Sequence, residues 1–198
     1  MIPIRMGAAV CFLLAFGVLL RAADTPASQL AAGPKDANGL TATLVLNKDT
    51  YTLDPSQAGK DFRDKIEAMR KGTGRPPALP QVDMVLRLTN TTDKDITISI
   101  GGDDSRVSLK LDGPGAISIN PKMAMTMEFR MGKATLIPAG KTTDIKISSL
   151  MNGMRGVTEY NYWTEPGSYK VTPSLVYPNP KGEGQTTVVS ALVGMKVK

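Results

Sequence analysis

A regular alternation of apolar and polar residues, repeated along most of the chain, constrains the fold more than any other feature. In the segment LTATLVL of residues 40–46, the side chains Leu40, Leu44 and Leu46 fall on alternate positions. Successive side chains of a β-strand point to opposite faces, so a period of two is typical of a half-buried strand. The same pattern recurs over residues 82–89, 96–100, 107–111, 143–148, 169–177 and 187–197. The sequence therefore predicts an all-β fold.

Residues that favour turns separate the predicted strands. Gly, Pro, Asn and Asp gather at residues 90–95, 101–104, 112–115, 138–140 and 178–182. These residue types supply the backbone conformations and local hydrogen bonds of tight turns. We expect residues 101–104 to form a hairpin loop. Short strands at this spacing indicate one antiparallel β-sandwich domain over residues 39–198.

One insert, residues 54–80, interrupts the strand pattern. Asp54 precedes Pro55, and Gln57 follows at the third position, which predicts a helix start with Gln57 reaching back as in a capping box. The helix is expected to span about residues 55–71. One face carries its apolar side chains, Ala58, Phe62, Ile66 and Met69. Because this face is narrow and lacks Trp or a basic excess, we expect a lid over an open end of the sandwich, in preference to a partner-binding or membrane-surface helix.

The N-terminal residues 1–23 are expected to be a signal peptide. A single basic residue, Arg5, precedes an uncharged apolar run at residues 8–20. This run is shorter than the roughly 20 residues of a membrane span, and small residues suited to cleavage follow it. Residues 24–38, rich in Ala, Pro and Gly, are expected to form a flexible linker. The chain is thus expected to be secreted, periplasmic or held at the cell envelope, with an uncleaved anchor as the alternative.

Cysteine content and charge narrow the possible partners. Cys11 is the only cysteine and lies in the predicted signal peptide, so we expect the exported chain to have no disulfide and to depend on its core for stability. The formal net charge is +6, with both signs interspersed. We therefore expect no nucleic-acid partner and, after signal cleavage, no stable membrane insertion.

The segment EPGSYKV, residues 165–171, resembles the tyrosine corner of immunoglobulin-like domains. Glu165, Gly167, Tyr169 and Val171 have the spacing acid-x-small-x-Tyr-x-apolar. In that motif the phenol bonds a backbone group a few residues upstream. Val171 stands where antibody domains have their second cysteine, so the resemblance is to the disulfide-free branch.

Two further segments extend this resemblance over roughly residues 82–177. They are residues 86–98, LRLTNTTDKDITI, and residues 136–141, LIPAGK. Together with the Tyr169 segment they are similar to exported bacterial immunoglobulin-like domains, including those like the bacterial intracellular proteinase inhibitor. The resemblance implies an immunoglobulin-like β-sandwich, to which the residue pattern of segment 54–80 adds one helical insert. No segment matches a reactive loop, so it does not imply inhibition.

The catalytic repertoire of the chain is small. The sequence contains no His and, after export, would contain no Cys, which removes the commonest general base and the thiolate nucleophile. Ser105, between Asp104 and Arg106, keeps a Ser- or carboxylate-dependent hydrolase open as an alternative. The glycine-rich stretch around it is typical of a loop, however. We predict no catalytic residues and no enzymatic activity.

A calcium site at Asp103 and Asp104 is a more specific functional interpretation of the same loop. Calcium takes 6–8 oxygen ligands. Two adjacent carboxylates supply too few, and Asp112 follows only after a whole predicted strand. The sequence therefore predicts neither a metal site nor a cofactor.

An unusual methionine stripe lies in residues 122–131, KMAMTMEFRM. Its alternate positions are Met123, Met125, Met127, Phe129 and Met131. In an extended strand these side chains would share one face, which suits core packing because methionine fills irregular gaps. Thioethers also bind Cu(I), so a Cu(I)-binding periplasmic protein is an alternative. Met151 and Met154, in the loop-like segment 151–156, keep this alternative open.

These observations predict an exported, non-enzymatic binding or structural module of the cell envelope. Its partner is expected to be a protein or an envelope component. The sequence specifies neither the ligand nor the oligomeric state.

Overall fold

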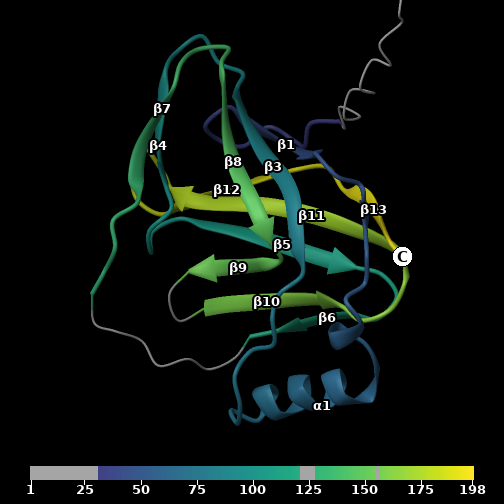
Figure 1. The fold of residues 1–198 in the computed structure, drawn as a ribbon. Coiled ribbons are helices and arrows are strands. Elements are labelled where there is room, and N and C mark those ends of the chain that lie inside the picture. The colour runs from purple at the N-terminus through teal and green to yellow at the C-terminus, as the bar shows by residue number, and fades with distance from the viewer. Residues whose placement is uncertain (1–30, 121–127, 155–156) are drawn as a thin grey trace, which may run out of the picture.

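The computed structural model describes residues 31–120, 128–154 and 157–198 (Figure 1). The predicted signal peptide and residues 24–30 of the predicted linker lie outside the described residues. The described chain consists mostly of β-strands and has a single α-helix, so the all-β prediction is confirmed. Its strands are β1 (Leu40–Leu46), β2 (Thr50–Tyr51), β3 (Gln81–Asn90), β4 (Ile96–Ile100), β5 (Arg106–Asp112), β6 (Ala116–Ile119), β7 (Lys133–Ile137), β8 (Thr142–Ser149), β9 (Met151–Met154), β10 (Val157–Trp163), β11 (Gly167–Pro178), β12 (Gln185–Val189) and β13 (Val193–Val197).

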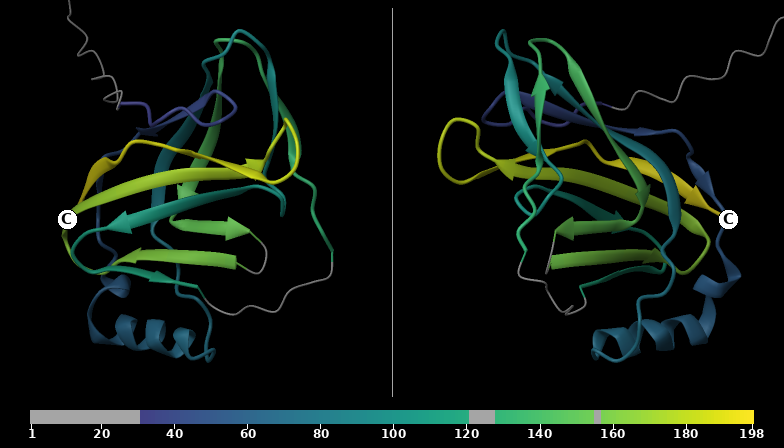
Figure 2. Two further views of the ribbon diagram at one scale, coloured as in Figure 1. Left: turned by 180° about the vertical axis from the view of Figure 1, so that it is seen from behind. Right: turned by 60° about the vertical axis from the view of Figure 1, so that its left-hand side comes forward.

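Hydrogen-bonded pairing groups these strands into sheets (Figures 1 and 2). One sheet has the order β1-β3-β8. The largest is centred on β11, with β5 along one edge and β12 and β13 in succession along the other, where β2 extends β13. Smaller sheets are formed by β6-β10-β9 and by β4 with β7. The paired strands run antiparallel, except β2 and β13, which run parallel.

The main core lies between the β1-β3-β8 sheet and the β11 sheet. In β1 the side chains of Leu40, Ala42 and Leu44 are fully buried, and the residues between them are half-buried. The long strand β11 alternates in the same way. Both strands contribute to one apolar cluster. Fully burying a large apolar side chain stabilises a fold by about 1.5–3 kcal/mol, so this shared cluster holds the two sheets together.

A second core forms beneath helix α1 (Gly59–Arg70). The buried side chains of Phe62, Ile66 and Met69 pack with Tyr160 and Tyr162 of the β6-β10-β9 sheet. Figure 1 shows the helix lying along this sheet, away from β1 and β12. The predicted apolar helix face therefore packs against a sheet. No helix among the described residues is both long and apolar enough to cross a membrane.

The start of the helix differs from the prediction of one helix over residues 55–71. Residues 55–57 form a short 3-10 helix, Ala58 is extended, and α1 begins at Gly59, whose φ is +76°. Asp54 accepts a hydrogen bond from the Ser56 amide at 2.8 Å, as a helix cap does. The predicted capping box is wrong, because the buried Gln57 side chain donates to the carbonyl of Ala78 at 2.8 Å. Gln57 thus ties the two ends of the insert together.

The predicted strand over residues 187–197 is in fact two strands, β12 and β13, separated at residues 190–192. The neighbouring strand β11 carries Pro173 at this level. The Pro173 carbonyl accepts from the Ser190 amide at 2.9 Å, but proline has no N–H to return the bond. The Ser190 hydroxyl instead accepts from the Leu44 amide at 2.9 Å, which links this break to β1.

Several strands were not predicted: β2, β6, β7, β9 and β10. Among them, β9 occupies residues 151–154, which the sequence indicated as loop-like. Strand β9 pairs with β10, and β10 also pairs with β6.

Residues 33–38 fall in the segment that was expected to be a flexible linker. In the structure the Gly33 amide donates to the Ala42 carbonyl at 2.8 Å. The Tyr177 hydroxyl donates to the Asp36 carboxylate at 2.5 Å, and the buried Asn38 side chain donates to Tyr177 at 3.2 Å. Residues 33–38 are therefore packed against β1 and β11 as part of the folded domain.

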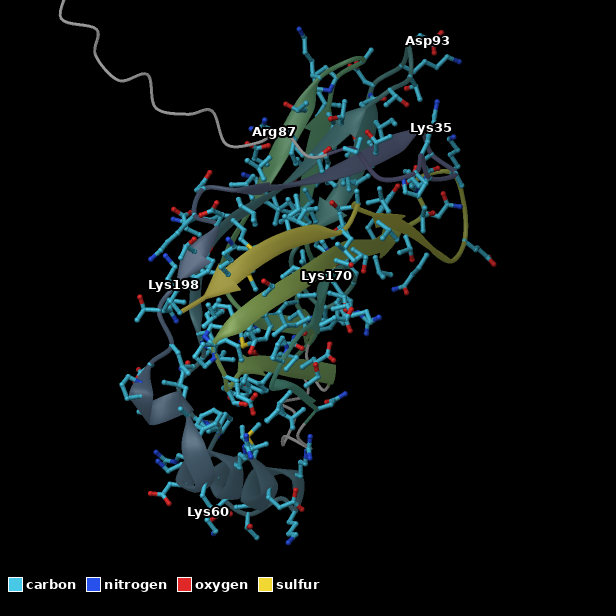
Figure 3. The ribbon with its side chains drawn as sticks, turned by 90° about the vertical axis from the view of Figure 1, so that its right-hand side faces the viewer. Lys35, Lys60, Arg87, Asp93, Lys170 and Lys198 are labelled. Carbon is cyan, nitrogen blue, oxygen red and sulfur yellow. The ribbon has the colours of Figure 1, made fainter. Side chains whose placement is uncertain are left out.

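Charged side chains point to solvent from well-separated elements. Figure 3 labels Lys60 on α1, Arg87 on β3, Lys170 on β11 and Lys198 at the end of the chain, and these lie far apart. Arg87 forms a two-contact ion pair with Asp144 of β8, both at 2.8 Å. The labelled basic residues thus form no continuous stripe on the face shown.

Candidate functional site

The segment 101–105 is not the hairpin loop that the sequence predicted. Strand β4 pairs with β7 and β5 pairs with β11, so residues 101–105 connect two different sheets. The Asp103 amide donates to the Arg130 carbonyl at 2.8 Å, and the Arg130 amide returns a bond to Asp103 Oδ2 at 2.9 Å. Asp104 Oδ1 accepts from the Gly132 amide at 3.2 Å. The two carboxylates therefore hold the stretch that leads into β7.

Gly102 makes this close approach possible. Its φ is +75°, and a Cβ at this position would lie 2.4 Å from the Gly132 amide nitrogen. Only glycine combines that backbone conformation with the absence of a side chain. The glycines of the segment thus serve a tight junction between two chain segments.

The candidate calcium ligands do not come together. Asp112 ends β5 and forms an ion pair with Lys110 at 3.2 Å, while Asp103 and Asp104 bond to backbone amides. Within the described ranges, no three His, Cys, Asp or Glu side chains are grouped so that they could hold a metal ion.

Ser105, the candidate nucleophile, is buried, and its hydroxyl donates to the Gly101 carbonyl at 2.7 Å. This bond closes the segment 101–105 on itself. A hydroxyl committed to a backbone carbonyl contributes to the local structure. The alternative of a hydrolase that uses Ser105 stays untested.

The structure describes two residues of the methionine stripe, Phe129 and Met131, and neither of them packs in the core. Phe129 is 63% exposed and Met131 is 77% exposed, and residues 128–132 form no strand. The prediction of core packing is therefore wrong for these two residues. Met123, Met125 and Met127 lie outside the described residues. The alternative that this stripe binds Cu(I) stays untested.

The hydrogen bond expected from the Tyr169 hydroxyl to a backbone group a few residues upstream is present. The Tyr169 hydroxyl donates to the Glu165 carbonyl at 2.7 Å and also contacts the Pro114 carbonyl. The phenol ring is fully buried, and burial raises the pKa of Tyr169 above its ordinary value. Tyr169 therefore fastens the turn before β11 to the turn before β6.

A hollow in the described structure opens between β5 and β9, and we call it the β5–β9 slot. Its volume is about 480 Å³. Val107, Ile145 and Leu175 form an apolar wall, and Met151 and Asn152 stand on the β9 side. Ser105, Asp103 and Arg130 also line it, so the junction described above forms part of its rim.

The slot exists because β5 and β9 approach each other without a backbone ladder. Both strands lie side by side in Figures 1 and 2, but neither pairs with the other. Side chains bridge them instead: Asn152 and Asn161 both donate to the carbonyl of Leu109, at 3.1 and 3.3 Å. Ser118 in turn donates to Asn161 Oδ1. The bridge closes one end of the gap.

Asn152 carries the most informative atom of the slot. Its side chain is 5% exposed, and Oδ1 has no hydrogen-bond partner in the described part of the chain. Buried polar atoms are almost always paired, because an unpaired one costs about 1–3 kcal/mol. No sequence signal points to this atom, since the alternation pattern does not reveal which strands lie next to Asn152.

No known family model matches the chain, and no similar sequence was found among curated proteins.

Proposed function

We propose that this protein is an exported, non-enzymatic binding module with an immunoglobulin-like β-sandwich fold, and that the β5–β9 slot holds its ligand. The ligand is expected to be part of a protein or of another cell-envelope component.

The strand order supports an immunoglobulin-like fold. In that fold strands A, B and E share one sheet, while F lies between C and G in the other. The order β1-β3-β8 would correspond to A, B and E. Strand β11, which pairs with β5 on one side and with β12 and β13 on the other, would correspond to F between C and G. The hydrogen bond from Tyr169 to the Glu165 carbonyl is a further local likeness.

The unpaired Asn152 Oδ1 is the observation that carries the functional proposal. Asn152 lines a hollow of about 480 Å³ that has an apolar wall, and its buried Oδ1 is an acceptor with no partner among the described residues. Ligand pockets typically combine apolar walls with a few placed polar groups, in volumes of about 300–1,000 Å³. A ligand with an apolar group and a hydrogen-bond donor would satisfy both features.

N-acetyl-leucinamide tests this proposal, because it joins an isobutyl group to amide donors. Titrated into the ¹⁵N-labelled protein, it is expected to shift the amide resonances of Val107 and Asn152 in a saturable way. Shifts confined to other surfaces, or no saturable shift, would contradict the proposal.

Two tryptophan substitutions locate the binding. Met151, at the slot, is 49% exposed, and Leu192, outside the slot lining, is 50% exposed. Met151→Trp is expected to fill the mouth of the slot and abolish the shifts, whereas Leu192→Trp should leave them unchanged. Equal loss in both variants would show that the effect does not depend on the slot.

A further inference from the structure

We propose that the ligand of the β5–β9 slot is an extended peptide segment, which adds to the free edge of β5 at Val107 and places an apolar side chain inside the slot. This inference rests on the proposed function, since it specifies the ligand of the same site.

The backbone N–H and C=O groups of β5 point alternately toward β11 and away from it. Strand β11 pairs with β5 on one side, and Leu109 lies opposite Pro173. The Pro173 carbonyl points to the other side of β11, where it accepts from the Ser190 amide at 2.9 Å. In an antiparallel ladder, hydrogen-bonded and non-hydrogen-bonded residue pairs alternate. Leu109 and Pro173 are therefore a non-hydrogen-bonded pair, and the backbone groups of Leu109 point away from β11.

A second observation agrees with this assignment. The Leu109 carbonyl accepts hydrogen bonds from the side chains of Asn152 and Asn161, which lie on the side away from β11. Val107 is two residues from Leu109, so its N–H and C=O point to the same side. Val107 also lines the slot. Its backbone donor and acceptor therefore face the hollow.

The Val107 backbone groups are free within the described chain. The ladder with β11 does not use them, and no other hydrogen bond in the described ranges joins them to a partner. An unpaired strand edge is a template for a further strand. Peptide recognition by strand addition uses such an edge for affinity and a neighbouring pocket for side-chain specificity.

The chemistry of the slot matches an extended peptide in three respects. At the usual distance between strands, a peptide can donate a hydrogen bond to the Val107 carbonyl and accept one from the Val107 N–H. Another of its N–H groups can supply the donor that Asn152 Oδ1 lacks. One of its side chains can then lie against Val107, Ile145 and Leu175, which favours Leu, Ile, Val, Met or Phe. An apolar compound without backbone amides would leave the polar edge unpaired.

The bridge from Asn152 to Leu109 limits how far a strand can enter. At Leu109 the gap between β5 and β9 is closed by side-chain hydrogen bonds. The peptide is therefore expected to pair with β5 only on the Ser105 and Val107 side of the bridge. A short contact of this kind predicts a modest affinity unless flanking residues add contacts at the rim.

The experiment uses pools of capped pentapeptides, each with Leu, Ile, Val, Met or Phe at the centre and mixed residues at the flanks. Binding to the ¹⁵N-labelled protein is followed through the amide resonances of Val107, Ser105 and Gly153. The best peptide is then compared with an analogue N-methylated at its central amides. We expect the analogue to bind about tenfold more weakly or worse, because it loses strand hydrogen bonds and keeps its side chain.

The outcomes separate the two proposals. Equal binding of the parent and N-methylated peptides at the slot would overturn strand addition and leave the slot as a ligand site. If neither the peptides nor N-acetyl-leucinamide perturb the slot, both proposals fail.

A protein variant gives an independent readout. Because the Val107 N–H lies outside the ladder, Val107→Pro is expected to fold, as proline is tolerated where its missing N–H faces outward. Because Val107 also lies in the apolar wall, the variant should weaken both peptides, but it should weaken the parent peptide several-fold more than the N-methylated analogue. An equal effect on both peptides would contradict pairing at Val107. If Val107→Pro does not fold, the comparison of the two peptides decides the question.

Discussion

Buried polar side chains determine where the strands of this protein meet. Tyr169 joins the turns before β6 and β11, and Asn161 and Asn152 bridge β10 and β9 to β5. The pair Tyr177–Asp36 fastens residues 33–38 to β11. Each of these groups is costly to bury without a partner, so each fixes one specific arrangement.

Removing the Tyr169 hydroxyl tests the tyrosine corner. Tyr169→Phe would leave the part-buried Glu165 carbonyl without the 2.7 Å hydrogen bond from the buried Tyr169 side chain. We expect the free energy of unfolding to fall by about 1–3 kcal/mol. Urea denaturation followed by the fluorescence of Trp163, the only tryptophan, measures the change. An unchanged denaturation midpoint would contradict a structural role for the hydroxyl.

The Tyr177–Asp36 pair predicts how stability depends on alkaline pH. Burial raises the pKa of Tyr177, and the hydrogen bond to Asp36 raises it further. An unfolded tyrosine loses its proton near pH 10, whereas the folded one keeps it. The stabilisation is thus fully present below about pH 10 and is lost as the pH rises toward the folded pKa.

The matched variant for this pH dependence is Tyr177→Phe. It is expected to be less stable than the wild type at pH 7 and to lose stability less steeply above pH 10. The difference in slope should be about 1.4 kcal/mol per pH unit, the value for one proton. Urea denaturation at several pH values measures both slopes. Identical slopes would show that Tyr177 titrates equally in the folded and unfolded states.

The sequence allowed a hydrogen bond between residues close in the chain to be predicted, but not one between distant residues. The Tyr169 hydrogen bond joins residues four positions apart, so its spacing was visible in the chain. The bond from Asn152 to Leu109 joins residues 43 positions apart, and only the folded topology brings them together. Phe129 was assigned to the core because it continued an alternating pattern, but the structure places it on the surface.

Among the elements, the long strands with one buried face were predictable, and β10, which is buried on both faces, was not. Strands β1, β3 and β11 alternate because one face meets the core. In β10 the consecutive residues Tyr160, Asn161, Tyr162 and Trp163 are all buried. Tyr162 packs under α1 and Trp163 belongs to the main core, so both faces of β10 are covered. A strand buried on both faces loses the period of two on which the prediction depends.

Gly59 tests the observed break before α1. In one continuous helix over residues 55–71, Gly59→Ala would stabilise the protein by about 1 kcal/mol. In the structure Gly59 has a φ of +76°, so alanine should instead cost about 1–2 kcal/mol, although nothing lies within 4 Å of its Cβ.

Gly182→Ala is the control for this substitution. Gly182 also has open space around its Cβ and does not have a positive φ. Its replacement should change stability by less than about 0.5 kcal/mol. Thermal or urea unfolding of both variants gives the comparison, and a stabilising Gly59→Ala would restore the single predicted helix.

For the whole molecule, the sequence predicted the class of fold and left the pairing of the strands open. Alternation marks strands, but the partner of each strand depends on contacts between distant residues. Strand β4 was expected to pair with β5, and it pairs with β7. The resulting crossing at residues 101–105 opens the β5–β9 slot, so the candidate site is a consequence of topology.

The proposed binding site requires that the edge of β5 facing the slot is open, and amide hydrogen exchange of the free protein measures whether it is. The backbone N–H of Ser108 points to β11 within the ladder, while the N–H of the neighbouring Val107 points to the slot. Amides with stable hydrogen bonds exchange only when the structure opens. The Val107 amide is therefore expected to exchange about a hundredfold faster than the Ser108 amide, or faster still, after correction for intrinsic rates. Equal protection of Val107 and Ser108 would show that this edge is already paired, and would contradict the proposed binding site.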